Sequence, residues 1–366
     1  MVFSIKQNIL LDGLNKISGP TAAKQNFPVL NSVLIETTNN NKIKLTTTDL
    51  NTTIITTLDA QILKQGKILV PFKQFISIIH EFPQNEITLE LFKNNLSIKC
   101  ENIELEITTL NTNEFPKTDQ PKNISLIKID PQELLYMIRL TSFSVGHEDT
   151  NYVLNGVLFE ITNNTIRGVS TDGKRLSIIT RKLPRNQPEL KTKINFILST
   201  RTINEIQKIL KDKEDEIFFY IKENSVGFDL KSIKIITRPI EGEFPNYSQY
   251  IPEPQTNKLT INKNDIFSSL KRAALFSTPD YQSVTLELKK NKIIINKATP
   301  HIAKIKEEIN CQYTGKYFSV GFNPHYLIDV LKNIEEPSVN FEFAPPDNRA
   351  VLKKEDYIHI IVPMTI

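Results

Sequence analysis

The stretch Val-Leu-Asn-Gly-Val-Leu-Phe-Glu at residues 153–160 nearly repeats Val-Leu-Asn-Ser-Val-Leu-Ile-Glu at residues 29–36, about 124 residues earlier. A Thr-Asp pair and then a Glu-Phe-Pro tripeptide follow each copy at similar distances, and a looser third copy begins near residue 284. The period is close to one third of the 366 residues, which is too long for a solenoid repeat and is the size of a compact domain. The pattern predicts one domain fold used three times in tandem, over residues 1–122, 123–253 and 254–366.

Each predicted domain opens with an alternating strand and a short amphipathic helix, and a second helix follows later. In the first domain, Leu10, Leu14 and Ile17 recur at helical spacing. Asn-rich turns and strands rich in Ile, Val, Phe and Thr fill the remainder of each unit. This order of elements predicts an α+β fold in which sheets cover two helices per domain.

The composition indicates a cytoplasmic protein. The chain has 39% hydrophobic residues, enough for an ordinary core in each third. It has no apolar run long enough to span a membrane, and its first residues form an alternating strand rather than a signal peptide. The two cysteines, Cys100 and Cys311, fall in different thirds, which favours unpaired thiols over a disulfide or metal pair.

The net charge of +4 is mildly basic and indicates little by itself, but the cations occupy aligned positions. Superposing the repeats aligns Arg139 with Lys271, and Lys208 with Lys332, on the polar faces of the predicted helices. Solvated helix faces would also explain each cation taken singly. If the helices face one way, the repeated cations predict a basic stripe that contacts phosphates.

The motifs of common enzyme classes are absent from the sequence. There is no glycine-rich phosphate loop, dinucleotide fingerprint or nucleophile elbow, and the five histidines have no metal-binding spacing. We therefore expect no catalytic residues, no metal and no cofactor. The sequence leaves open the alternative of an enzyme whose chemistry has no recognised motif.

Two local segments stand out. Residues 171–176, Thr-Asp-Gly-Lys-Arg-Leu, predict a tight turn, and the counterpart at residues 48–51 lacks the glycine. The second copy therefore contains a glycine that the fold itself does not require. Residues 360–366 are apolar almost to the end of the sequence, whereas chain ends are usually polar, so we expect this segment to pack.

Several strings in order resemble one family along the whole chain, the bacterial DNA polymerase III beta subunit, or beta sliding clamp. The matching strings are Ser18-Gly19-Pro20, Phe27-Pro28-Val29-Leu30, Leu154-Asn155-Gly156, residues 171–176, Glu241-Gly242-Glu243-Phe244-Pro245-Asn246-Tyr247, Gly321-Phe322-Asn323 and Val362-Pro363-Met364.

This resemblance implies a DNA sliding clamp without enzymatic activity. A head-to-tail homodimer would close a ring around duplex DNA, with helices lining the hole and sheets forming the outer wall. The ring would tether the replicative DNA polymerase, the clamp loader and other DNA-processing proteins through short linear peptides. Contact with the DNA would be sequence-independent, as sliding requires.

The resemblance also implies three sets of site residues. The partner-peptide groove would comprise Leu154, Thr171, Gly173, Lys174, Arg175, Leu176, Pro245, Gln249, Tyr250, Ile360, Val362, Pro363 and Met364. The DNA-facing positions would be Lys24, Lys73, Arg139, Arg201, Lys208, Lys271 and Lys332. The dimer interface would place Leu105 and Ile107 of one subunit near Leu275 and Phe276 of the other. By pattern alone, these four apolar residues could equally belong to a core.

The groove departs from the family at three places. Lys174 replaces the usual histidine, Gln249-Tyr250 replaces an arginine and a small aliphatic residue, and Thr365 replaces a terminal arginine. These changes leave the peptide preference of the groove open. Two alternatives to the clamp remain: a monomeric β-rich scaffold that binds peptides without encircling DNA, and a DNA-processing enzyme of unknown class.

Overall fold

The computed structural model describes the chain in ten segments. These are residues 1–22, 27–117, 126–146, 151–185, 190, 192–211, 216–222, 224–255, 257–344 and 348–365. The contacts divide the chain into two compact units. Unit 1 contains Met1–Gln132, Asn186–Pro188 and Asn204–Pro239, and unit 2 contains Glu133–Arg185, Glu189–Ile203 and Ile240–Ile366.

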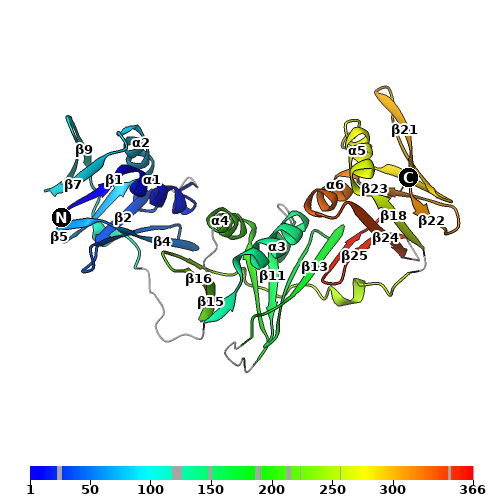
Figure 1. The fold of residues 1–366 in the computed structure, drawn as a ribbon, viewed down its shortest axis with the longest axis horizontal. Coiled ribbons are helices and arrows are strands. Elements are labelled where there is room, and N and C mark those ends of the chain that lie inside the picture. The colour runs from blue at the N-terminus through cyan, green and yellow to red at the C-terminus, as the bar shows by residue number, and fades with distance from the viewer. Residues whose placement is uncertain are drawn as a thin grey trace. The chain divides into compact units, whose positions relative to one another are not determined.

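Unit 1 is built on two antiparallel sheets, and Figure 1 labels some of their strands. The five-stranded sheet has the order β5 (Gln61–Lys64), β1 (Val2–Lys6), β7 (Glu86–Phe92), β8 (Asn95–Cys100) and β9 (Ile103–Thr108). The eight-stranded sheet has the order β10 (Ile127–Ile129), β15 (Ile217–Lys222), β16 (Ser225–Leu230), β17 (Ile233–Thr237), β4 (Thr52–Asp59), β3 (Lys42–Thr48), β2 (Ser32–Thr37) and β6 (Lys67–Pro71).

Unit 2 has a nine-stranded and a four-stranded sheet. The larger has the order β14 (Ile194–Ser199), β11 (Gly156–Ile161), β12 (Thr165–Thr171), β13 (Arg175–Lys182), β26 (Tyr357–Ile361), β25 (Arg349–Lys353), β24 (Ser338–Ala344), β18 (Lys258–Asn262) and β22 (Gln312–Tyr313). The smaller has the order β21 (Ala303–Asn310), β20 (Lys292–Thr299), β19 (Val284–Lys289) and β23 (Phe318–Phe322).

The described residues form six α-helices beside these sheets, two in each predicted domain, as expected. They are α1 (Gln7–Lys16), α2 (Phe72–Glu81), α3 (Pro131–Thr141), α4 (Thr200–Leu210), α5 (Lys263–Ala274) and α6 (Pro324–Asn333). In unit 1, α1 packs on α2, and in unit 2, α5 packs on α6 (Figure 1). The predicted apolar face of α1 is confirmed, because Leu10, Leu14 and Ile17 are fully buried.

Both large sheets pair strands from different sequence repeats. Strand β17 pairs with β4 in unit 1, and β26 pairs with β13 in unit 2. Each of these two inter-repeat strand pairings, or seams, therefore joins residues that lie roughly 180 positions apart in the chain. The α+β class is confirmed, whereas the three domain boundaries remain a prediction, because compact units and sequence repeats divide the chain differently.

Candidate functional site

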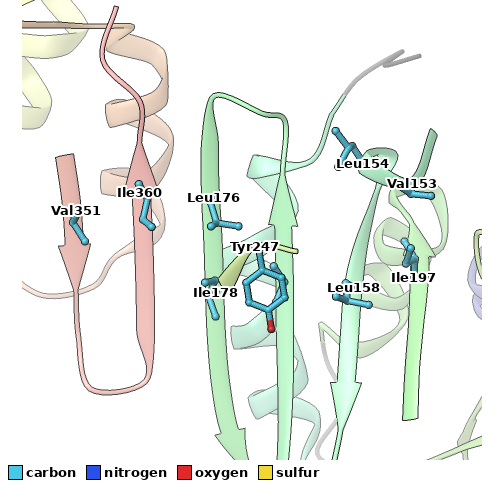
Figure 2. Packing of buried hydrophobic residues seen from close by; sticks show 10 residues of the cluster. Val153, Leu154, Leu158, Leu176, Ile178, Ile197, Tyr247, Val351 and Ile360 are labelled. Atoms are coloured by element: carbon cyan, nitrogen blue, oxygen red, sulfur yellow. The ribbon is translucent and has the colours of Figure 1, made fainter. Parts of the chain in front are cut away.

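The candidate site lies at the seam between β13 and β26 in unit 2. Leu176 pairs with Ile360 across this seam, and Ile360 pairs with Val351 on the next strand. Their side chains belong to one buried apolar cluster that also contains Leu154 and Tyr247 (Figure 2). Successive side chains on a strand point to opposite faces, so the register determines which residues meet here.

A cavity of about 310 Å³ opens beside this cluster. It is lined by Leu154, Thr171, Gly173, Arg175, Leu176, Pro245, Tyr247, Tyr250, Arg349, Ile360 and Val362. The structure thus brings together nine of the residues predicted for a peptide groove. Tyr247 and Arg349 are additional, although Tyr247 belongs to a motif already noted in the sequence.

Four residues of the predicted groove do not line this cavity. Lys174 is exposed in the turn before β13, and its carbonyl oxygen accepts from the Val362 amide at 2.9 Å. Gln249 is exposed in the short 3-10 helix Ser248–Tyr250. Pro363 is half-buried, and the Met364 amide donates to the Gly321 carbonyl at 2.8 Å, which attaches the end of the chain to β23.

The turn between β12 and β13 forms one rim of the cavity. The Asp172 carboxylate accepts from the amides of Lys174 and Arg175, both at 2.9 Å. Gly173 has a φ of +79°, a left-handed conformation that glycine adopts without steric cost, and a side chain there would meet open space. Local hydrogen bonds and one glycine therefore determine the shape of this rim.

Arg175 fastens that turn to the rest of unit 2. Its guanidinium pairs with Asp172 at 3.0 Å and with Asp329 of α6 at 2.6 Å. It also lies over the ring of Tyr326, 4.5 Å from the centroid. The Arg175 side chain is only 8% exposed, and two carboxylates compensate its charge. Its principal role is thus to hold the cavity wall in place.

A polar cluster is buried beside the wall. The His359 Nδ1 lies 2.8 Å from the Ser177 hydroxyl, which lies 2.8 Å from the hydroxyl of Ser144. All three residues have no exposed surface. Burial, with a smaller contribution from the charge of Arg175, lowers the pKa of His359 to about 3. The imidazole is therefore neutral at pH 7, and the cluster is inaccessible to a ligand.

The predicted DNA-facing residues that the structure describes lie on helices of both units. Lys73, Arg201, Lys208, Lys271 and Lys332 are exposed. Arg139 is less available, because it pairs with Glu335 at 2.5 Å. The Lys208 ammonium donates to the Asn15 carbonyl at 2.9 Å. Lys24 lies outside the described residues.

The predicted interface residues are not fully buried. Leu275 is 77% exposed at the end of α5, and Phe276 is half-buried. Leu105 and Ile107 are half-buried on β9, the edge strand of the five-stranded sheet. The alternative that all four residues form a core is wrong for Leu275.

The described part of the chain contains no group of three or more His, Cys, Asp or Glu residues that could hold a metal ion. Its helices are too short or too polar to cross a bilayer. Cys100 and Cys311 are free thiols, and burial raises the pKa of both.

Comparison with known proteins covers the whole chain. Residues 1–119, 128–246 and 248–365 match the N-terminal, central and C-terminal domains of the DNA polymerase III beta subunit. A beta sliding clamp from Pseudomonas putida is 25% identical over 371 residues and covers 100% of both chains. One from Buchnera aphidicola is 28% identical over 345 residues, 93% of this chain and 92% of its own.

A solved structure agrees with the sequence matches. The DNA polymerase sliding clamp from Pseudomonas aeruginosa, crystallised with a ligand, is 25% identical, with a TM-score of 0.93 and 100% of both chains covered. Matches to all three domains in order, together with a fold shared over the full length, lead to one conclusion. The chain belongs to the DNA polymerase III beta subunit family, the beta sliding clamps.

Proposed function

We propose that this sliding clamp acts as a head-to-tail homodimer that encloses duplex DNA and tethers DNA-processing proteins to it. The observation that carries the proposal is the full-length match to the family, across all three of its domains. The protein performs no catalysis in this role, and its site of action is the cytoplasm. Tethering needs a closed ring, a surface that tolerates sliding and a docking site for partners.

Two sheet edges suit the closure of such a ring. Strands β9 and β21 lie at the edges of their sheets, where backbone groups can pair with another chain. Exposed Glu104 and Glu106 on β9 are acidic, whereas exposed Lys304 and Lys306 on β21 are basic. A contact between two different surfaces is heterologous, and it closes into a ring when the rotation allows. Ion pairs between these glutamates and lysines would favour β9 of one protomer against the first half of β21 of the next, since the second half carries Glu307 and Glu308.

The exposed cations on the helices suit loose contact with DNA. Lysines and arginines that meet phosphates bind without reading bases, so the contacts can shift along the duplex. The net charge of +4 is modest, and tight phosphate contacts would hinder movement. The ring would hold DNA through its closed topology more than through affinity.

The cavity of unit 2 suits the docking of short peptides from polymerases and clamp loaders. Its walls combine aliphatic side chains with the rings of Tyr247 and Tyr250, and the Thr171 hydroxyl and two guanidinium groups supply polarity. A mostly apolar pocket with a few polar groups fixes both the anchor and the register of a peptide.

The mass in solution tests the dimer. Sedimentation equilibrium at micromolar concentration should give twice the 41.9 kDa of one chain. Changing Leu275 and Phe276 together to Glu should give folded monomers, because an unpaired charge is costly at an apolar contact. Leu63→Glu is a matched control, since Leu63 is 66% exposed on β5, and it should stay dimeric.

A monomeric wild-type chain would contradict the ring and favour a peptide-binding scaffold. A dimeric mass for the double variant would place the interface elsewhere.

A further inference from the structure

Strand β20 of unit 2 carries a buried cation. Lys297 is only 3% exposed. Its ammonium donates to the carbonyl oxygen of Tyr281 and, at 2.8 Å, to that of Ser283. Among the described residues no carboxylate pairs with this ammonium, and burial lowers the pKa of Lys297. Burying a cation without a counter-ion is costly, so these two backbone contacts are what compensates the Lys297 charge.

The strand registers give Lys297 an equivalent in each of the other two repeats. Equivalent residue pairs in the three hairpins are Ile35–Leu45, Phe159–Gly168 and Leu286–Ile295. Two residues after the second member of each pair stand Thr47, Ser170 and Lys297. The Thr47 hydroxyl donates to the Ile17 carbonyl at 2.6 Å, directly after α1. The Ser170 hydroxyl donates to the Thr141 carbonyl at 2.6 Å, at the end of α3.

In the third repeat the longer lysine side chain reaches beyond the end of the helix. Residues 275–283 form the loop that joins α5 to β19, and the Lys297 ammonium meets the far end of this loop. Thr299 lies two residues further along β20, on the same face of the sheet, and its hydroxyl donates to the Phe276 carbonyl at the near end. Both ends of the loop are therefore attached to one strand.

Side chains at both ends of this loop are exposed. Leu275 is 77% exposed and Tyr281 is 47% exposed. A loop that is ordered before association loses less conformational entropy when its partner binds. We infer that Lys297 is a positioning residue of the dimer, which holds residues 275–283 in the shape that receives the next protomer; the inference rests on the homodimer proposed above.

Lys297→Met tests the inference, because it keeps the length of the side chain and removes its N–H donors. The variant should stay folded, and its dimer Kd from sedimentation velocity over a dilution series should rise about tenfold, since two backbone carbonyls lose a charged donor. Lys292→Met is the matched control. It removes the same charge from an exposed position of β20, where Lys292 pairs with Glu308, and should leave the dimer Kd unchanged.

Lys297→Thr is a second variant, which introduces the residue that the first repeat has at this position. Its hydroxyl is too short to replace the ammonium at the far end of the loop. We therefore expect a folded protein with the same loss of dimer affinity as Lys297→Met.

Hydrogen exchange separates the order of the loop from dimer formation. In the Leu275→Glu, Phe276→Glu background the loop should have no partner, so its amides report on the loop alone. The Ser277 amide donates to the Ala274 carbonyl, and the Tyr281 amide donates to the carbonyl of Thr278, both at 3.1 Å. Adding Lys297→Met should make these two amides exchange about ten times faster and leave the amides of α5 protected.

A wild-type dimer whose Kd is unchanged in both Lys297 variants would overturn the inference and leave the dimer standing. Faster exchange throughout unit 2, α5 included, would also overturn it, because Lys297 would then stabilise the whole unit rather than the loop. A monomeric wild-type chain would overturn both the dimer and the inference.

Discussion

The two inter-repeat seams pair their strands in the same register but differ in the side chains at matching positions. In unit 1, Thr52 pairs with Thr237 and Ile54 with Ile235. At the corresponding places in unit 2, Arg175 pairs with Ile361 and Ser177 with His359. Backbone pairing is thus common to both seams, whereas the side chains differ, and those of the unit 2 seam border an apolar cavity with a buried polar cluster beside it.

The turns that lead into the two seams share their backbone geometry but differ in the residue at the left-handed position. Asp49 accepts from the Asn51 amide at 3.0 Å, as Asp172 accepts from Lys174 at 2.9 Å. Leu50 has a φ of +74°, close to the +79° of Gly173, although leucine rarely adopts this conformation. The turn geometry therefore belongs to the fold, and glycine at the cavity rim removes a strain that the first copy retains.

The largest expected difference between the seams is their response to acid. The pKa of His359 is about 3 in the folded chain, below the usual value of about 6.5. Between these values the unfolded chain binds the extra proton, so stability is complete above pH 6.5 and falls as the pH decreases towards 3. Unit 2 should lose about 2–3 kcal/mol of unfolding free energy between pH 7 and 4.5.

Urea unfolding monitored by hydrogen exchange in each unit measures this response. His359→Gln should flatten the pH dependence of unit 2, and His301→Gln, at an exposed position, should leave it intact. If the unfolding free energy of unit 2 still falls steeply with acid in His359→Gln, titratable groups other than His359 cause the fall.

Truncating the apolar wall should weaken peptide binding. Leu176→Ala removes an anchor contact from the cavity and should cost about 2 kcal/mol of binding free energy, or roughly thirtyfold in Kd. Thr53→Ala changes the corresponding position of the other seam, where Thr53 pairs with Ile236, and should have no effect. Titration of a labelled apolar peptide compares the two variants. Equal losses of peptide affinity in both variants would show that the peptide does not bind at the cavity.

Exchanging the turn residues should give the smallest effects. Leu50→Gly relieves a left-handed leucine but frees the unfolded chain, so the net gain should stay below about 1 kcal/mol. Gly173→Leu should cost about 1–2 kcal/mol through backbone strain, since space for the side chain exists. Thermal unfolding of the two variants should shift in opposite directions. Shifts of the same sign would show that the turns are not equivalent.

Much of the fold follows from periodicity in the sequence. Buried residues at helical spacing, such as Leu10 and Leu14, correctly predict α1. The sheets that cross repeat boundaries could not be predicted, because alternation identifies a strand but not its partner. For the same reason Arg349 was missed: its place in the cavity depends on the pairing of β25 with β26. Nine residues named from the resemblance line the cavity, and the backbone amide of Met364 donates a hydrogen bond to Gly321 of β23.

Retention on DNA of different topology tests the central claim most directly. After loading, the clamp should remain on closed circular DNA through a high-salt wash and be lost from linear DNA of equal length with unblocked ends. Salt weakens phosphate contacts by counterion competition, but it does not release a closed ring. Linearising the loaded circles with a restriction enzyme should release the retained protein. Equal retention on circular and linear DNA would contradict encirclement and leave an ordinary surface-binding protein.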